Sequence, residues 1–184
     1  MKRVAVHVLT VCIATTAFAG NVMINPGFEE GEDFDGWGDW NSHLNSRIVK
    51  HEELAHTGKQ CLELNIDLPD QNYGGMVQNI WEREGITWGD TIEVSCWVRT
   101  ERLINQEAYL LLEFIDDDWI SSGRYESEHV TGTRQWTKLT TRGTIPGKIA
   151  EPYLNKVHVS LTIVGKKSTG RIYFDSVQAS KENE

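Results

Sequence analysis

The chain lacks a long helical apolar pattern, a surplus of positive charge and any visible internal repeat. No window repeats apolar residues with the 3.6-residue period of an amphipathic helix, which disfavours a mainly helical fold. The net charge of −9 over 184 residues disfavours partners such as nucleic acid and anionic lipid. It also disfavours polyanionic polysaccharides, unless a groove is locally basic, whereas neutral glycans remain compatible.

Recognisable catalytic motifs are also missing. The chain has no Gly-x-Ser-x-Gly, no His-Glu-x-x-His, no phosphate-binding loop and no zinc-type Cys/His spacing. A glycosidase needs two carboxylates facing each other across a cleft, roughly 5 to 10 Å apart. Glu113 is one candidate, and no second acid falls opposite it. The sequence therefore predicts a protein that is not an enzyme.

The N-terminal segment has the pattern of an export signal. Lys2 and Arg3 precede a mostly apolar run over 4–18, and the small residues around Phe18 predict cleavage after Ala19. The apolar run is short for a membrane anchor. We therefore expect residues 1–19 to be removed and the mature protein to be secreted, extracellular or periplasmic.

The remaining chain has the size of one domain. Removing 19 of the 184 residues leaves 165, and losing Lys2 and Arg3 changes the net charge from −9 to −11. This length can bury a single sizeable core. We expect one domain over 20–180 and a frayed tail over 181–184.

Two cysteines remain after cleavage, because Cys12 leaves with the signal. An exported protein permits a disulfide between Cys61 and Cys96. Side-chain alternation points Cys61 away from Leu62, whereas Cys96 lies on the apolar side with Val94. Both a disulfide and two buried free thiols remain open at this point.

Most of the chain alternates between apolar and polar residues with a period of two, which is typical of half-buried strands. Gly- and Asp-containing turns separate these runs. Many short strands with such turns predict an all-β fold, a jelly-roll β-sandwich of two antiparallel sheets. The predicted strands are 61–67, 91–100, 108–116, 136–145, 156–164 and 171–180.

Five motifs in order resemble a known family. The chain is similar to carbohydrate-binding modules of the family 4/9/16/22 type, which are galactose-binding-domain-like jelly rolls often attached to xylanases and cellulases. The resemblance covers nearly the whole mature chain and implies carbohydrate binding on a concave sheet. The motifs are NPGFEEG with a following GW (25–37), HTGKQCLEL (56–64), VQNI with WGDTIEVSCWVRT (77–100), WTKLTT (136–141) and IYFDSVQ (172–178).

The alternation of apolar and polar residues predicts a sugar-binding face. If Val94, Cys96 and Val98 point into the core, Trp97 and its polar neighbours point outward. Aromatic rings cover the C–H face of a sugar, and amides, carboxylates and charged donors bind its hydroxyls. The predicted patch consists of Gln78, Trp97, Arg99, Tyr109, Glu113 and His158.

Structural interpretations stand beside this patch. Arg99 and Glu113 could form a cross-strand ion pair, and His158 could be an ordinary surface residue. Trp37 and Trp136 are expected to pack at the edge of the sandwich, because large aromatic side chains are mostly buried. Three tryptophans in predicted loops could line the rim of the groove: Trp40, Trp81 and Trp119.

The family resemblance also implies a structural calcium ion. Its side-chain ligands would be Glu29 and Asp175, with carbonyls near 57–59 completing the shell, since calcium prefers oxygen ligands. The alternative is that Glu29 caps a turn and Asp175 binds backbone amides. The acidic run 116–118 does not match an EF-hand loop and is expected to form a solvated hairpin tip.

These inferences predict a secreted module that binds a neutral polysaccharide reversibly. It would stand alone or serve as a subunit in an extracellular glycoside hydrolase assembly. One alternative is a weakly hydrolytic subunit of such an assembly, and another is an envelope adhesion domain that binds protein. Exposed rings on the concave face favour a glycan, whereas a flat apolar patch favours a protein.

Overall fold

The structure is a computed structural model, and it is all-β apart from one turn of 3-10 helix, η1 (Arg83–Gly85), in the part of the chain it describes. No helix in that part is long and apolar enough to cross a bilayer. The predicted signal segment 1–19 lies outside the described residues. Those residues are 20–31, 34–40, 44–66, 73–165 and 170–182.

All strand pairs in the described residues are antiparallel, and β5 takes part in half of them. The strands are β1 (Gly38–Asp39), β2 (Leu44–Lys50), β3 (Gln60–Ile66), β4 (Tyr73–Asn79), β5 (Thr91–Asp116), β6 (Ser121–Glu126), β7 (Val130–Thr144), β8 (Leu154–Gly165) and β9 (Arg171–Lys181).

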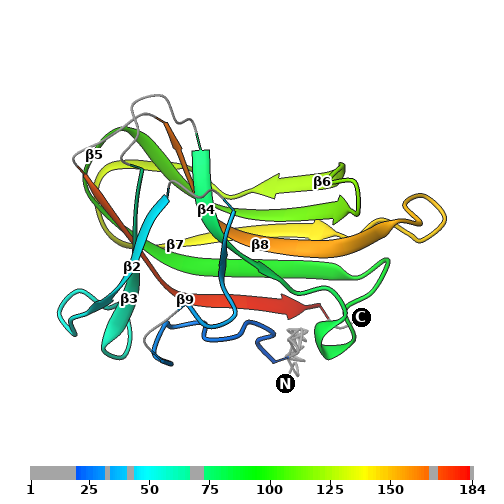
Figure 1. Ribbon diagram of the computed structural model, residues 1–184, viewed down its shortest axis with the longest axis horizontal. Coiled ribbons are helices and arrows are strands. Elements are labelled where there is room, and N and C mark those ends of the chain that lie inside the picture. The colour runs from blue at the N-terminus through cyan, green and yellow to red at the C-terminus, as the bar shows by residue number, and fades with distance from the viewer. Residues whose placement is uncertain (1–19, 32–33, 41–43, 67–72, 166–169, 183–184) are drawn as a thin grey trace, which may run out of the picture.

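The 26-residue strand β5 belongs to both layers of the sandwich. Its first half pairs with β7 and β9, and β9 continues to β3 and β2. Its second half pairs with β6 and β8, and β8 continues to β4 and β1. The strand bends between the halves, where Arg102 and Asn105 have positive φ angles. Figure 1 shows β5 curving around one end of the molecule at this bend.

The core lies between the two layers. From the first half of β5, Val94, Cys96 and Val98 are fully buried, and from the second half Leu110 and Phe114 are fully buried. The inward orientation predicted for these side chains is therefore confirmed, and so is the all-β jelly-roll sandwich. The alternation predicts separate strands over 91–100 and 108–116, whereas both belong to one continuous strand, β5.

The N-terminal motif closes one edge of this core. Asn25 and Phe28 have positive φ angles, and the Phe28 ring is buried against Trp37 at 5.5 Å between ring centroids. The Trp37 indole donates a hydrogen bond to the carbonyl of Asn25. Trp37 therefore packs at the sandwich edge, as predicted.

Both cysteines are buried free thiols. Cys96 faces the core, whereas the Cys61 thiol lies on the other side of its strand and contacts the carbonyl of Leu54 at 3.7 Å. Burial raises the pKa of both thiols, that of Cys61 to about 12. Such thiols are poor nucleophiles, because the thiolate is the reactive form.

The chain end is more ordered than predicted. Lys181 belongs to β9, and the amide of Glu182 donates a hydrogen bond to the carbonyl of Thr91. The predicted frayed tail 181–184 is therefore wrong for its first two residues, because backbone pairing with β5 extends past residue 180. Residues 183–184 lie outside the described part.

Candidate functional site

A groove of about 660 Å³ lies on the outer face of the layer that contains β4, β8, the second half of β5 and β6. We call this surface the groove face. Its side chains come from all four strands and from three loops. The groove is lined by Trp40, Tyr73, Val77, Tyr109, Leu111, Glu113, Ile115, Trp119, Arg124, Glu126, His129, His158, Ser160 and Val164.

Strand register brings these residues together. Ser160 of β8 pairs with Val77 of β4 on one side and with Leu111 of β5 on the other. Two residues along β8, His158 pairs with Glu113, and both side chains point to the same outer face. At every second residue of these strands, a row of side chains therefore runs across the outer face of the sheet.

A stacked pair of aromatic rings lies near one end of the groove. The rings of Trp40 and Tyr73 are 5.3 Å apart and tilted by 28°. The Trp40 indole donates a hydrogen bond to the Ser160 hydroxyl at 3.0 Å. Gly75 allows this approach, because a Cβ there would lie 2.6 Å from the indole nitrogen of Trp40. Both rings are partly exposed and can contact a ligand.

Trp119 lies at the opposite end of the groove, in the hairpin between β5 and β6. Its backbone has a positive φ angle, and its amide donates to the carbonyl of Asp116. The carboxylate of Asp116 also accepts the amides of Asp118 and Ile120. The predicted hairpin tip at 116–118 is confirmed. Trp119 is 69% exposed, so its ring is available for stacking.

A network of charged side chains borders the groove on the β6 side. Arg124 donates to the Tyr109 hydroxyl at 3.0 Å and to Glu126 at 2.8 Å, and it pairs with Glu113 at 3.6 Å. Burial raises the pKa of the Tyr109 hydroxyl, which therefore stays protonated near neutral pH. The network fixes the polar atoms that face the groove.

His129 connects this network to the ring of Tyr109. The two rings stack at 4.2 Å with 7° between their planes, so the imidazole covers the phenol. Both ring nitrogens of His129 contact carboxylates, Nδ1 that of Glu107 at 2.7 Å and Nε2 that of Glu126 at 3.1 Å. Burial opposes the charged imidazolium, but these two hydrogen bonds outweigh it and raise the pKa of His129.

His158 has the opposite electrostatic environment. Burial, with a smaller contribution from nearby Lys156, lowers its pKa to about 4. The imidazole is therefore neutral near pH 7 and can both donate and accept a hydrogen bond. Its ring centroid lies 6.0 Å from that of Trp119, and the Lys156 ammonium lies 5.2 Å from the Trp119 ring.

The structure brings together three of the six predicted sugar-binding residues. Tyr109, Glu113 and His158 all line the groove. Tyr109 forms part of the floor under His129 and is only 4% exposed, so it is not the open aromatic platform that the alternation suggested.

Trp97 and Arg99 lie on the outer face of the other layer, which we call the Trp97 face. The His56 ring stacks on Trp97 at 4.1 Å, and Trp136 contacts His56 edge-on. Arg99 pairs with Glu101 at 2.7 Å instead of with Glu113. The prediction that Trp97 shares a face with Tyr109 is wrong, because β5 changes layers between them.

Gln78 lies outside the groove as well. Its side chain is 1% exposed, accepts the amide of Ile24 and donates to the carbonyl of the same residue. It also accepts a hydrogen bond from Arg83. Gln78 pairs with the core residue Val159 and shares its inward orientation. Its role is to anchor the N-terminal segment.

Sequence reasoning identified part of the groove rim. Trp40 and Trp119 line the groove as expected, whereas Trp81 packs edge-on against Trp88 at 4.8 Å. It missed Tyr73, Arg124, Glu126 and His129. Arg124 and Glu126 are two residues apart, so in a strand both side chains point to the same face. This spacing did not identify strand β6, because β6 is short and has few apolar residues.

The predicted calcium junction brings three distant segments together. Glu29 accepts the amides of Lys59 and Gln60 at 2.7 and 2.8 Å, and Asp175 accepts those of His56 and Thr57 at 2.8 and 3.0 Å. These contacts match the alternative interpretation, in which both carboxylates bind amides.

Whether calcium fits this junction depends on the oxygen atoms that the junction offers as ligands. A Cβ placed on Gly27 would lie 3.6 Å from Glu29 and 3.7 Å from Asp175, so both side chains flank this glycine. Among the residues that the structure describes, no three His, Cys, Asp or Glu side chains gather as a metal cluster. A calcium ion here would need carbonyl ligands in addition to the two carboxylates.

No protein-family model matches the chain, and no curated protein matches it. Solved structures share its fold. The CBM22-1 xylan-binding domain of Paenibacillus barcinonensis Xyn10C is 17% identical, with a TM-score of 0.62 over 91% of this chain and 99% of that domain. TmCBM61, solved in complex with β-1,4-galactotriose, is 18% identical, with a TM-score of 0.61 over 89% of this chain and 100% of that one.

A third similar structure is named as a cyclase and not as a carbohydrate-binding module. The Stig cyclase Fisc from Fischerella sp. TAU is 12% identical, with a TM-score of 0.62 over 90% of this chain and 98% of that one. At these identities the similarity establishes the fold alone, the jelly-roll β-sandwich that these structures share. A shared fold does not by itself imply a shared function.

Proposed function

We propose that the chain is a carbohydrate-binding module that holds a neutral polysaccharide in the groove without catalysing a reaction. One observation carries this proposal: exposed aromatic rings stand at both ends of a groove whose lining combines polar side chains with apolar ones. Trp40 and Tyr73 lie at one end and Trp119 at the other. Sugars stack their C–H faces on such rings, and similar structures are named as modules that bind xylan or a galactotriose.

The charge arrangement in the groove favours a ligand without net charge. Arg124 is compensated by Glu113 and Glu126, and His129 by Glu126 and Glu107. The groove therefore offers donors and acceptors for hydroxyl groups. Hydroxyl contacts replace hydrogen bonds to water of similar strength, so we expect modest affinity.

The same contacts support binding without hydrolysis. A glycosidase needs one carboxylic acid that remains protonated near its working pH. Burial alone would raise the pKa of Glu126, but hydrogen bonds from Arg124 and His129 lower it. Glu113 also pairs with Arg124. This arrangement keeps Glu126 as an anion and uses it to orient Arg124 and His129.

Three further parts of the proposal extend beyond the groove. The N-terminal segment directs the protein out of the cytoplasm, and an extracellular glycoside hydrolase is a natural partner for a module of this fold. Calcium bound near Glu29 and Asp175 would supplement the amide hydrogen bonds that join the N-terminal segment around Glu29, the loop over 56–60 and β9.

A panel of soluble oligosaccharides tests the groove. We expect calorimetric titration to detect one of xylo-, gluco-, manno- or galacto-oligosaccharides, and Trp119→Ala to weaken that binding about tenfold, since a stacked aromatic ring contributes roughly 1 kcal/mol or more. The matched control is Tyr153→Ala, which removes a 76% exposed ring that does not line the groove.

The outcomes separate the proposal from its alternatives. Loss of binding in Trp119→Ala with an unchanged melting temperature supports a glycan groove. If no neutral oligosaccharide binds, or if Tyr153→Ala weakens binding as much as Trp119→Ala does, the groove proposal fails. Release of reducing sugar during prolonged incubation would show that the module is hydrolytic.

A further inference from the structure

A second cavity, of about 600 Å³, lies at the bend of β5 and shares no lining residue with the groove. We call it the arginine pocket. It is built from the bend itself, the start of β9 and one stretch of β7. Its lining residues are Arg99, Thr100, Glu101, Arg102, Thr133, Arg134, Gln135 and Arg171.

The pocket is basic in a chain whose net charge is −9. Four arginines line it and only one carboxylate, Glu101, which pairs with Arg99 at 2.7 Å. Among the described residues, no carboxylate forms an ion pair with Arg102, Arg134 or Arg171. Positive charge is therefore concentrated here and only partly compensated, by Glu101 and by Glu63, both of which raise the pKa of Arg171.

Backbone geometry and a buried ring hold the arginines in place. Arg102 has a positive φ angle, and its amide donates to the Thr133 hydroxyl at 3.0 Å, which ties the bend to β7. The buried Tyr173 ring lies below, 5.9 Å from the Arg99 guanidinium carbon, and its hydroxyl accepts a hydrogen bond from Arg171 at 3.5 Å. Two arginines are thus anchored on one fixed ring.

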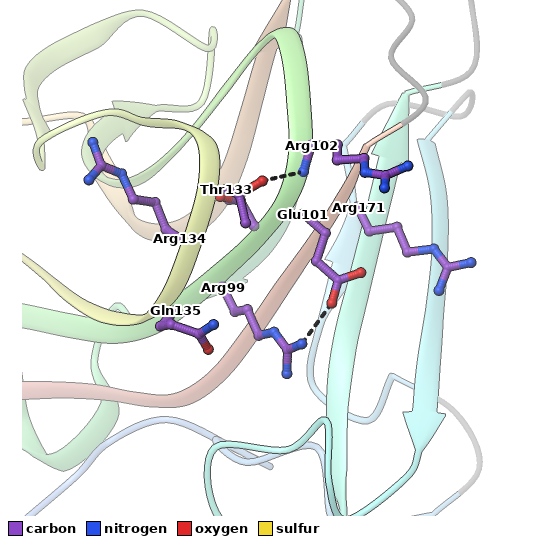
Figure 2. A pocket seen from close by; sticks show the side chains of 8 residues that line it. Arg99, Glu101, Arg102, Thr133, Arg134, Gln135 and Arg171 are labelled. Atoms are coloured by element: carbon purple, nitrogen blue, oxygen red, sulfur yellow. Dashed lines mark hydrogen bonds and ion pairs between the residues drawn. The ribbon is translucent and has the colours of Figure 1, made fainter.

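The pocket already contains one carboxylate and shows how it is held. Figure 2 shows the Arg99–Glu101 ion pair at the centre, with Gln135 near Arg99 and with Arg171 and Arg102 on the side of Glu101. A guanidinium group binds a carboxylate through two parallel N–H donors. Arg102 and Arg171 can therefore receive a second carboxylate beside Glu101, while the Gln135 amide can bind hydroxyl groups.

We propose that the arginine pocket is a second binding site, for the carboxylate of an acidic saccharide such as a uronic acid residue. Its volume lies within the range of small-molecule sites, roughly 300 to 1,000 Å³. The pocket would add recognition of an acidic group to a protein whose groove is electrostatically compensated. It acts independently of the groove, because the two sites have no residue in common.

A trisaccharide of galacturonic acid is the probe, and its methyl ester is the uncharged control ligand. We expect the acid to bind in calorimetric titration and the ester not to bind. Arg171→Gln and Arg102→Gln should each weaken binding about tenfold, since hydrogen bonds between charged groups are the stronger class. Lys138→Gln, which removes an equal charge from an exposed position on β7 outside the pocket, should change affinity less than about twofold.

Glu101→Gln provides a test of opposite sign. It removes the carboxylate that competes for Arg99, so we expect it to strengthen binding of the acid several-fold. A folding defect cannot produce such a gain. Higher salt should weaken binding of the acid, because exposed charges are screened.

Three results would overturn the proposal. These are equal binding of the acid and its methyl ester, no effect of either arginine substitution, and equal affinity for inorganic sulfate, which would indicate a site for any small anion. Trp119→Ala separates the two sites: it should weaken neutral glycan binding about tenfold and leave binding of the acid unchanged. Failure of the groove proposal would therefore leave this one standing.

Discussion

The two outer faces of the sandwich use the same strand for opposite purposes. On the groove face, Glu113 and Tyr109 project from the second half of β5 into a groove with open aromatic rings at both ends, and His129 covers Tyr109 itself. On the Trp97 face, the first half of β5 projects Trp97 with the same alternation, but His56 stacks on its indole. One face keeps its aromatic rings available to a ligand, whereas the other uses them to pack a loop.

The difference comes from what covers each face. The His56 loop is held on the Trp97 face by Asp175, which is fully buried and accepts the amides of His56 and Thr57. On the groove face, the hairpin that carries Trp119 stands at one end and leaves the centre open. A tryptophan on the outer side of a strand is therefore a binding platform only where no loop is anchored above it.

The largest effect is expected from Asp175→Ala. This change leaves the part-buried amides of His56, Thr57 and Ser176 without their acceptor, and an unpaired amide costs about 1–3 kcal/mol when it is fully buried. We expect unfolding in urea to show a loss of at least about 3 kcal/mol. Asp118→Ala, at the exposed hairpin tip, is the control and should change stability by less than about 0.5 kcal/mol. Equal stability of the two variants would show that the loop is not anchored by Asp175.

Trp97→Ala should destabilise the fold without affecting the groove. The side chain is half-buried between the strand and His56, so we expect a loss of about 2 kcal/mol, less than for a fully buried tryptophan. Oligosaccharide affinity should stay within about twofold of the wild type, because Trp97 lies on the opposite face. Calorimetric titration together with thermal unfolding measures both. Weaker glycan binding with unchanged stability would reverse the assignment of the two faces.

Removal of calcium is expected to have the next largest effect on stability. If calcium bridges Glu29 and Asp175, EDTA should lower the melting temperature by roughly 3–6 °C, which corresponds to a calcium concentration about tenfold above its Kd. Excess calcium should restore the original value. The double variant Glu29→Gln and Asp175→Asn should not respond to EDTA. An unchanged melting temperature in the wild type would show that the amide hydrogen bonds alone join these segments.

The last prediction concerns the pH dependence of stability. The folded pKa of His158 is lowered from 6.5 to about 4, so below pH 6.5 the unfolded state binds the proton more readily than the folded state. The stabilisation by neutral His158 is therefore complete above pH 6.5 and is lost as the pH falls toward 4. His158→Gln should show a shallower loss of stability over this interval in urea unfolding. Identical pH profiles for both proteins would contradict this environment for His158.

The raised pKa of His129 has the opposite sign. Its stabilising contribution is present below the pKa of the unfolded imidazole and is lost as the pH rises through the higher folded pKa. The wild-type profile combines both histidines, and comparison with His158→Gln isolates the contribution of His158.

Several elements were predictable because they depend on local alternation. Val94, Cys96, Leu110 and Phe114 are buried as the period-two pattern requires. Strand β6 was not predicted, because Ser121–Glu126 has too few apolar residues to show which side is buried. Its pairing with β5 supplies the contacts that the sequence lacks, and Arg124 reaches the groove only through that pairing.

The sequence by itself determined the fold class and which side of each half of β5 enters the core, because alternation of apolar residues is a local property of a strand. Only the tertiary structure decided that Trp97 and Glu113 face opposite sides of the molecule. Inward directions from the two layers converge on one core, so outward directions diverge, and a strand that bends from one layer to the other sends its outward side chains to both surfaces.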